Sequence, residues 1–226
     1  VETAARRPEW ADAKRADDLG RLLAEALEET TTSWFGVRRS AGVRVQMRSL
    51  ERRLRRLADC EAASRAQGWR TEQVEASLDG MLDLGHGMPP QRITGRIDRI
   101  DRQLGTGRLR ILDYKTGDRA PDPATSHRVG RPPNHRWIDL QLPLYRHLHA
   151  AQHGLDEREI EVGYATLSAG PRGVAFRVIE KWSEAEFAEA IEKAREVVRA
   201  IRAGSFASPG PGAWADEFSN LCGEPV

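Results

Sequence analysis

The sequence predicts an α/β fold, with a central mixed sheet flanked by helices and an N-terminal helical layer before it. Two segments near the start, 19–27 and 43–57, repeat apolar residues at helical spacing. After Gly68, short segments rich in Ile, Val and Leu alternate with Gly and Pro, which is typical of strands. A chain of 226 residues with 39% hydrophobic residues can form one globular domain with a helical annex.

The two N-terminal segments each predict an amphipathic helix. The first runs to a Thr-rich stretch and should end before Gly36. The second has its apolar residues on one face, and arginines fill most of the others. These arginines either solvate the helix or contact a nucleic-acid backbone, and the sequence leaves both interpretations open. They are Arg48, Arg52, Arg53, Arg55 and Arg56.

Three strands are expected next, within 68–78, 92–101 and 108–115, with Gly105-Thr106-Gly107 as the turn between the last two. This order predicts an antiparallel meander. The segment 117–137 shows no periodicity, so we expect a long mobile loop. Its His127, His135 and Trp137 either contact DNA or belong to a disordered basic loop.

The remaining elements are a short helix around 143–152, strands within 160–167 and 173–179, and a long closing helix. Ser183 and Glu186 form the capping-box pattern at the start of that helix, and Gly204 is its expected stop. We therefore divide the chain into an N-terminal helical layer (1–67), a core (68–206) and a C-terminal tail (207–226).

The composition excludes few classes of protein. Lys and Arg number 35 against 34 Asp and Glu, so any nucleic-acid footprint must be local. Two distant cysteines and the absence of a long apolar run favour a cytoplasmic protein with no membrane segment. The chain begins with Val rather than Met, from which we expect a piece of a longer polypeptide.

The residues that carry chemistry concentrate in 95–101 (GRIDRID) and 111–117 (ILDYKTG). Residues two apart on a strand share a face, so Asp113 and Lys115 should project together, and a neighbouring strand can bring Asp98 beside Asp113. Two converging carboxylates favour a hard cation such as Mg²⁺ between them. The other interpretation is an ordinary set of cross-strand ion pairs on a solvated face. We expect Asp113 and Lys115 to be accessible to solvent.

These two stretches resemble the PD-(D/E)xK nuclease superfamily, and within it the RecB-like branch with AddB-type subunits. Gln141-x-x-x-Tyr145 is similar to the motif that follows the catalytic strand, and Glu75 occupies the place of a preceding acidic residue. The resemblance implies a restriction-endonuclease-like core. It also implies Asp98, Asp113 and Glu75 as metal ligands, Lys115 as the residue that polarises the attacking water, and Gln141 and Tyr145 as substrate-positioning residues.

The same resemblance implies Mg²⁺, or Mn²⁺ in its place, as cofactor and DNA as substrate. It favours an exonuclease over an endonuclease, acting in DNA repair or recombination with a helicase domain or subunit as partner. Two departures qualify this. Ala24 stands where the branch often has a metal-binding His, and the only cysteine near the end is Cys222, so we expect no iron–sulfur cluster. An inactive DNA-binding or scaffolding module with the same fold is the alternative.

Overall fold

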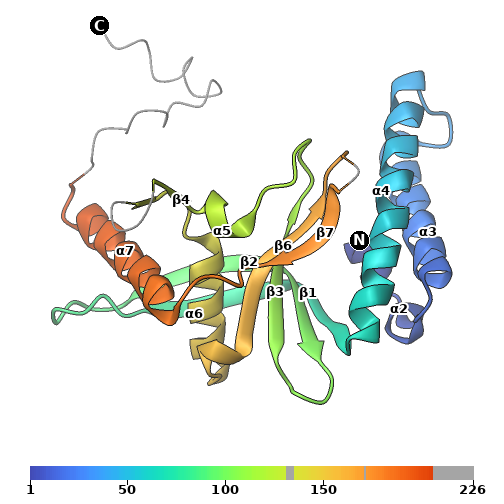
Figure 1. Cartoon of the computed structure of the whole chain (residues 1–226). Helices are drawn as coiled ribbons and strands as arrows, with labels where there is room; N and C mark the ends of the chain where they lie inside the picture. The colour runs from blue at the N-terminus through green and yellow to red at the C-terminus, as the bar shows by residue number, and fades with distance from the viewer. Residues whose placement is uncertain (131–134, 171, 206–226) are drawn as a thin grey trace, which may run out of the picture.

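A five-stranded sheet forms the centre of the molecule in the computed structural model, which describes residues 1–130, 135–170 and 172–205 (Figure 1). The predicted tail and Cys222 lie outside the described residues. Along the sheet the strand order is β1-β2-β3-β6-β7. The strands are β1 (Trp69–Leu82), β2 (Gln91–Gln103), β3 (Leu109–Lys115), β6 (Ile160–Leu167) and β7 (Val174–Val178).

The sheet is mixed, as predicted. β1, β2 and β3 form an antiparallel meander, β3 pairs with β6 in parallel, and β7 returns antiparallel to β6. Gly105 and Gly107, with φ of 93° and 77°, make the turn between β2 and β3, a conformation that side chains disfavour. A Cβ on Gly163 would lie 2.0 Å from the carbonyl oxygen of Arg177, so β6 and β7 require glycine there.

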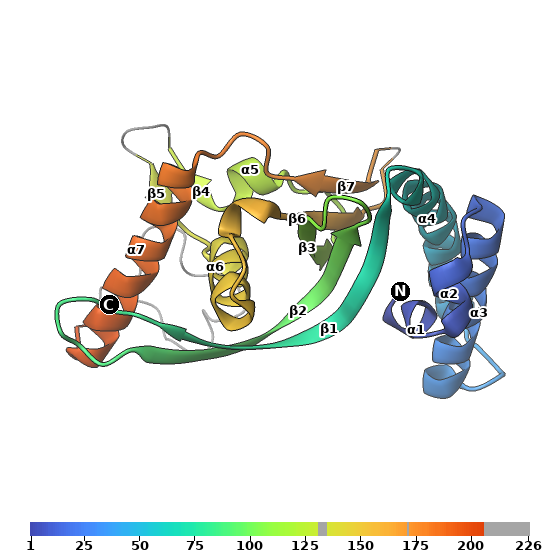
Figure 2. The same ribbon diagram turned by 90° about the horizontal axis from the view of Figure 1, so that it is seen from below.

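Helices cover both faces of this sheet. α6 (Gln141–His153) and α7 (Glu184–Arg202) contribute to one core, which includes Leu142, Leu148, Phe187 and Ile191. On the other face α4 (Ala41–Ala66) packs against β7, and α3 (Ala16–Phe35) lies on the outer side of α4 (Figure 2). The N-terminal helical layer therefore reaches the sheet mainly through α4. Two short helices, α1 (Glu2–Ala5) and α2 (Pro8–Asp12), precede α3.

Local sequence signals fix the ends of these helices. α3 stops at Gly36, whose φ is 69°, and the Ser40 hydroxyl accepts from the Val43 amide at the start of α4. Ser183 and Glu186 form the predicted capping box of α7. Pro143 lies in the first turn of α6, where its missing N–H breaks no helical bond. No helix in the described part of the chain is long and apolar enough to cross a membrane.

The first strand is longer than its sequence pattern suggested. β1 continues to Leu82 and pairs with β2 up to that residue, with a register shift between Thr71 and Gln73, and the end of the hairpin lies below α7 (Figure 1). Leu82 and Leu84 are fully buried, and Arg199 of α7 donates to the Leu84 carbonyl at 2.7 Å. The predicted boundary at residue 78 was wrong because α7, distant in sequence, covers and stabilises the extension.

The prediction of a long mobile loop over 117–137 was also wrong. The segment contains helix α5 (Pro123–Ser126), strand β4 (Arg128–Val129) and strand β5 (Arg136–Trp137), and β4 pairs with β5. Trp137 is 8% exposed and its ring centroid lies 5.1 Å from that of Trp182. His127 is fully buried. Aromatic packing against the residues before α7 buries His127 and Trp137 and removes them from contact with DNA.

A buried charge network joins α4 to the sheet, and it consists of Glu61, Arg99, Asp101 and Arg110. The Arg99 guanidinium forms ion pairs with Glu61 of α4 and, at 2.6 Å, with Asp101. Arg110 contacts Asp101 at 2.7 Å. Burial acts to raise the pKa of Asp101, but the two guanidiniums outweigh it and hold that pKa below its usual range. Two positive and two negative groups therefore neutralise one another between helix and sheet.

Candidate active site

Three carboxylates lie in a row across β1, β2 and β3. In the β1–β2 register Val74 faces Arg99 and Ala76 faces Ile97, which puts Glu75 opposite Asp98. The β2–β3 ladder ends at the pair Arg99 and Leu112, so Asp98 and Asp113 occupy the next position, where the strands separate. The meander thus brings together the three predicted metal ligands from three consecutive strands.

Glu75 is held in an unusual backbone conformation. Its φ is 52°, in the left-handed region that non-glycine residues rarely adopt, and such a residue typically costs about 1–3 kcal/mol. Its carboxylate lies 3.3 Å from the Arg96 guanidinium, which is mostly exposed. Glu75 is therefore at the edge of the row, where it pairs with the exposed Arg96.

The Asp98 side chain joins β2 to β3 at the point where the backbone hydrogen bonds between these strands end. Its Oδ2 accepts a hydrogen bond of 2.8 Å from the backbone N–H of Tyr114, in place of a backbone carbonyl. Burial raises the pKa of Asp98, the Tyr114 N–H opposes that shift, and the negative charges of Asp113 and Glu75 add to it. A carboxyl group in this position is stabilised as an anion by any cation that binds beside it.

Asp113 is buried rather than accessible, which corrects the expectation from the sequence. It is 5% exposed, because Gln141 and Lys115 cover it. Its Oδ1 accepts from Gln141 Nε2 at 2.7 Å, and its Oδ2 lies 2.7 Å from Lys115 Nζ. That ion-pair contact lacks hydrogen-bond geometry, so Oδ2 is buried without a hydrogen-bond donor from the described residues. Lys115 itself is about one-third exposed, at 32% for its side chain.

Gln141 and Tyr145 lie on the face of α6 that meets the carboxylates, as the four-residue spacing predicted. Gln141 Nε2 donates to Tyr145 Oη at 3.0 Å as well as to Asp113, and Tyr145 Oη donates to the Arg96 carbonyl at 2.7 Å. Lys115 Nζ donates to Gln141 Oε1 at 3.4 Å. The helix therefore connects the ends of β2 and β3 through two polar side chains.

Sequence reasoning missed a second set of residues that supports Lys115, namely Tyr164, His127 and Asp139. Lys115 Nζ lies 5.0 Å from the centre of the Tyr164 ring, and Tyr164 Oη is 2.8 Å from His127 Nε2. The other His127 nitrogen contacts Asp139, whose Oδ1 accepts from the Gln141 amide at the start of α6. These contacts join segments far apart in the sequence, and no local motif indicates that the three residues lie together.

The donor set fits a hard divalent cation. Asp98 and Asp113 present carboxylate oxygens at adjacent strand ends, and one of these oxygens is buried without a hydrogen-bond donor. Within 1–130, 135–170 and 172–205, no three His, Cys, Asp or Glu side chains are already arranged to hold a metal ion. Two carboxylates, with water and substrate oxygens completing the shell, match the usual demands of Mg²⁺.

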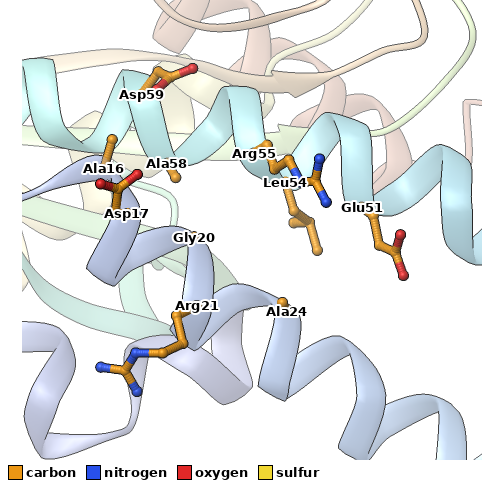
Figure 3. Close-up of a pocket in the computed structure, with 10 residues that line it drawn as sticks. All are labelled: Ala16, Asp17, Gly20, Arg21, Ala24, Glu51, Leu54, Arg55, Ala58 and Asp59. Carbon is orange, nitrogen blue, oxygen red and sulfur yellow. The ribbon is translucent and has the colours of Figure 1, made fainter.

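Ala24 lies on α3 and faces α4. It lines a pocket of about 540 Å³ between α3 and α4, together with Gly20, Leu54, Arg55 and other residues of those two helices (Figure 3). Glu75, Asp98, Asp113 and Lys115 do not line this pocket. A histidine at position 24 would therefore line the groove between these two helices.

The mixed sheet presents two carboxylates and a lysine at the ends of adjacent strands, and these oxygens suit a divalent cation. A profile of the PD-(D/E)XK nuclease superfamily matches residues 3–223. The chain belongs to the PD-(D/E)XK nuclease superfamily, and its α/β architecture agrees with the restriction-endonuclease-like fold. Nucleases of this superfamily typically use divalent metal ions. No curated protein sequence matches the chain.

Proposed function

We propose that the protein is a divalent-metal-dependent deoxyribonuclease whose active centre contains Asp98, Asp113 and Lys115. The observation that carries the proposal is the convergence of these three groups, in which the buried Asp113 carboxylate lies 2.7 Å from Lys115 Nζ. Asp98 and Asp113 would hold the cation, and Glu75 would join them directly or through water. We infer Mg²⁺, with Mn²⁺ as a substitute.

The reaction is hydrolysis of a phosphodiester. A water oxygen forms a bond to phosphorus while the bond from phosphorus to the departing sugar oxygen breaks; the water gives up a proton to solvent, and the sugar oxygen gains one. When bound, the cation neutralises phosphate oxygens and lowers the pKa of water. Lys115 donates hydrogen bonds to the attacking water, and it suits this task because an ammonium is a compact cation.

Gln141 and Tyr145 are positioning residues in this proposal. Gln141 fixes the Asp113 carboxylate through a bond of 2.7 Å and accepts from Lys115, so it sets the separation of these two groups. Burial raises the pKa of Tyr145, so its hydroxyl stays protonated and keeps donating to the Arg96 carbonyl. Together they keep the end of β2 beside the end of β3.

The wider context is inferred from the sequence resemblance. We place the protein in the RecB-like branch, as an exonuclease of DNA repair or recombination that works in the cytoplasm with a helicase domain or subunit. The alternative is an inactive module with the same fold, which Ala24 favours because the branch often has a metal-binding His at that place. Ala24 lines the groove between α3 and α4.

The test is cleavage of labelled DNA with Mg²⁺, Mn²⁺ or EDTA. Linear single-stranded, linear double-stranded and circular substrates separate exonuclease from endonuclease activity. We compare wild-type protein with Lys115→Ala and Asp113→Asn, and use Lys193→Ala as the matched control because Lys193 pairs only with Glu196 on the exposed side of α7. Metal-dependent cleavage that survives in the control and falls at least about 100-fold in the other variants is expected.

DNA binding without cleavage under every metal would contradict the proposal and favour the inactive module. Cleavage that persists in Lys115→Ala would place the active centre elsewhere. Circular dichroism of each variant checks that it folds. This control is needed because Asp113 is buried, and a loss of cleavage is informative only in a folded variant.

A further inference from the structure

The solvent-facing side of α4 carries a row of arginines that we call the arginine track, defined as Arg48, Arg52, Arg55 and Arg56. All four are exposed. Their spacing of four, three and one residues puts them on neighbouring positions of one helical face, opposite the side on which Met47, Leu54 and Leu57 are buried. The track is therefore a continuous cationic ridge rather than a scatter of charges.

The cations of the track are free of acidic partners within the described residues. Arg48, Arg52 and Arg55 form no ion pair or hydrogen bond there, although Glu51 and Asp59 lie on the same helix. On α7, by contrast, Arg199 and Arg195 both contact Glu192. The helix thus keeps a local excess of positive charge in a chain whose net charge is only +1.

The middle of α4 lies beside the strand end that carries Lys115. Arg53, which lies between Arg52 and Arg55 in the sequence, donates to the Leu167 carbonyl at 3.1 Å and the Thr116 carbonyl at 3.4 Å, and Thr116 directly follows Lys115. Arg56 donates to the Gly170 carbonyl at 3.0 Å. These contacts fix the middle of α4 at the carboxyl ends of β3 and β6, and the N-terminal half of α4 extends beyond the sheet (Figure 1).

The dimensions of the track match a nucleic-acid backbone. Eight residues separate Arg48 from Arg56, which is about 12 Å along a helix at 1.5 Å per residue. One strand of duplex DNA advances about 3.4 Å per phosphate, so the track spans about three to four phosphates. Guanidinium groups bind phosphate through paired N–H donors and do so regardless of base sequence.

We propose that the arginine track binds the phosphate backbone of a DNA strand and guides it to Asp98, Asp113 and Lys115. The inference rests on the proposed nuclease function and adds to it the surface along which substrate approaches. An acidic protein partner is the competing occupant. DNA is favoured because Arg53, which lies within the span of the track, contacts the residue that follows Lys115, and a substrate strand has to arrive at that strand end.

The experiment measures binding separately from cleavage. Fluorescence anisotropy with a labelled 20-nucleotide single strand and the matching duplex is recorded in EDTA at several salt concentrations, for wild-type protein and for Arg48→Gln/Arg52→Gln/Arg55→Gln. The control replaces three exposed arginines remote from the track and has the same change in net charge. It is Arg6→Gln/Arg92→Gln/Arg158→Gln.

We expect the track variant to bind DNA at least tenfold more weakly, with the slope of log K against log salt reduced by about two to three, because each lost phosphate contact lowers it by about 0.7–0.9. The control should match wild-type protein. Both triple variants change only exposed side chains, and thermal unfolding confirms that they fold. Equal affinity and salt slope in the track variant and the control would overturn the inference.

The remaining outcomes separate the inference from the proposed function. Track-dependent binding by a wild-type protein that cleaves no DNA with any metal would support the track and refute the nuclease. Cleavage that is unaffected by the track variant, with unaltered binding, would leave the nuclease and refute the track. Binding of polyglutamate that depends on the track, while DNA binding does not, would assign the surface to an acidic protein and overturn the inference.

Discussion

Glu61 offers the sharpest test of how the N-terminal layer holds the sheet. It belongs to the buried charge network, where it and Arg99 are only 1% and 2% exposed. Glu61→Gln retains the shape of the side chain and removes one of two negative charges. Arg99 and Arg110 would then face Asp101 alone, and the buried network would carry an uncompensated positive charge.

The expected loss of stability follows from that imbalance. Removing one partner of a buried ion pair typically costs about 3–5 kcal/mol. Asp101 still accepts from Arg99, and the glutamine oxygen can accept one further bond, so we expect the lower end, about 3 kcal/mol. For a chain of this size each kcal/mol corresponds to about 2–4 °C, which gives a fall in Tm of about 6–12 °C.

Urea unfolding followed by tryptophan fluorescence measures this change, since the chain has six tryptophans. The matched control is Glu196→Gln, which breaks an exposed ion pair with Lys193 and should change stability by about 0.5 kcal/mol or less. A loss in Glu61→Gln no larger than in the control would refute the reasoning that this network holds α4 on the sheet.

Two further predictions concern buried titratable side chains. Burial, followed by the charge of His153, lowers the pKa of His149 from 6.5 to about 4. Between these pH values the unfolded chain therefore binds one more proton than the folded chain. The free energy of unfolding should fall by up to about 3 kcal/mol as the pH drops from 6.5 to 4. Urea titrations of His149→Gln should show a weaker dependence of this free energy on pH. An unchanged slope would show that His149 titrates normally. Tyr164→Phe keeps the ring beside Lys115 but leaves His127 Nε2 buried without its partner, so we expect about 1–3 kcal/mol of destabilisation. The folded variant should cleave DNA at a rate within a few-fold of wild type. A loss of cleavage as large as that of Lys115→Ala would contradict this expectation.

Much of the fold could be predicted because its signals are local. The capping box of Ser183, the stop at Gly36 and the turn at Gly105 and Gly107 each depend on a few adjacent residues. The pairing of Asp98 with Asp113 could also be expected, since one short turn joins their strands. The spacing of Gln141 and Tyr145 placed both on one helical face, and the structure shows that this face meets the site.

The incorrect predictions concern residues whose environment depends on contacts between segments distant in the sequence. His127 and Trp137 sit in a polar, proline-rich stretch, yet Trp182 and Phe187 from beyond β7 provide the aromatic surface that buries them. Burial of Asp113 likewise depends on Gln141, which arrives 28 residues later in the chain. Periodicity within a segment carries no information about such partners, so the sequence predicted that Asp113 lies beside Lys115 and Asp98 but not that it is buried.

The meander also has a consequence for the order in which the protein folds. β1, β2 and β3 are consecutive and joined by short connections, whereas the parallel pairing of β3 with β6 must wait for a crossover of more than forty residues. Glu75, Asp98 and Asp113 therefore meet early, before Gln141 is in place. Their mutual repulsion opposes this first step, so we expect ions that neutralise the row to accelerate folding as well as to support chemistry.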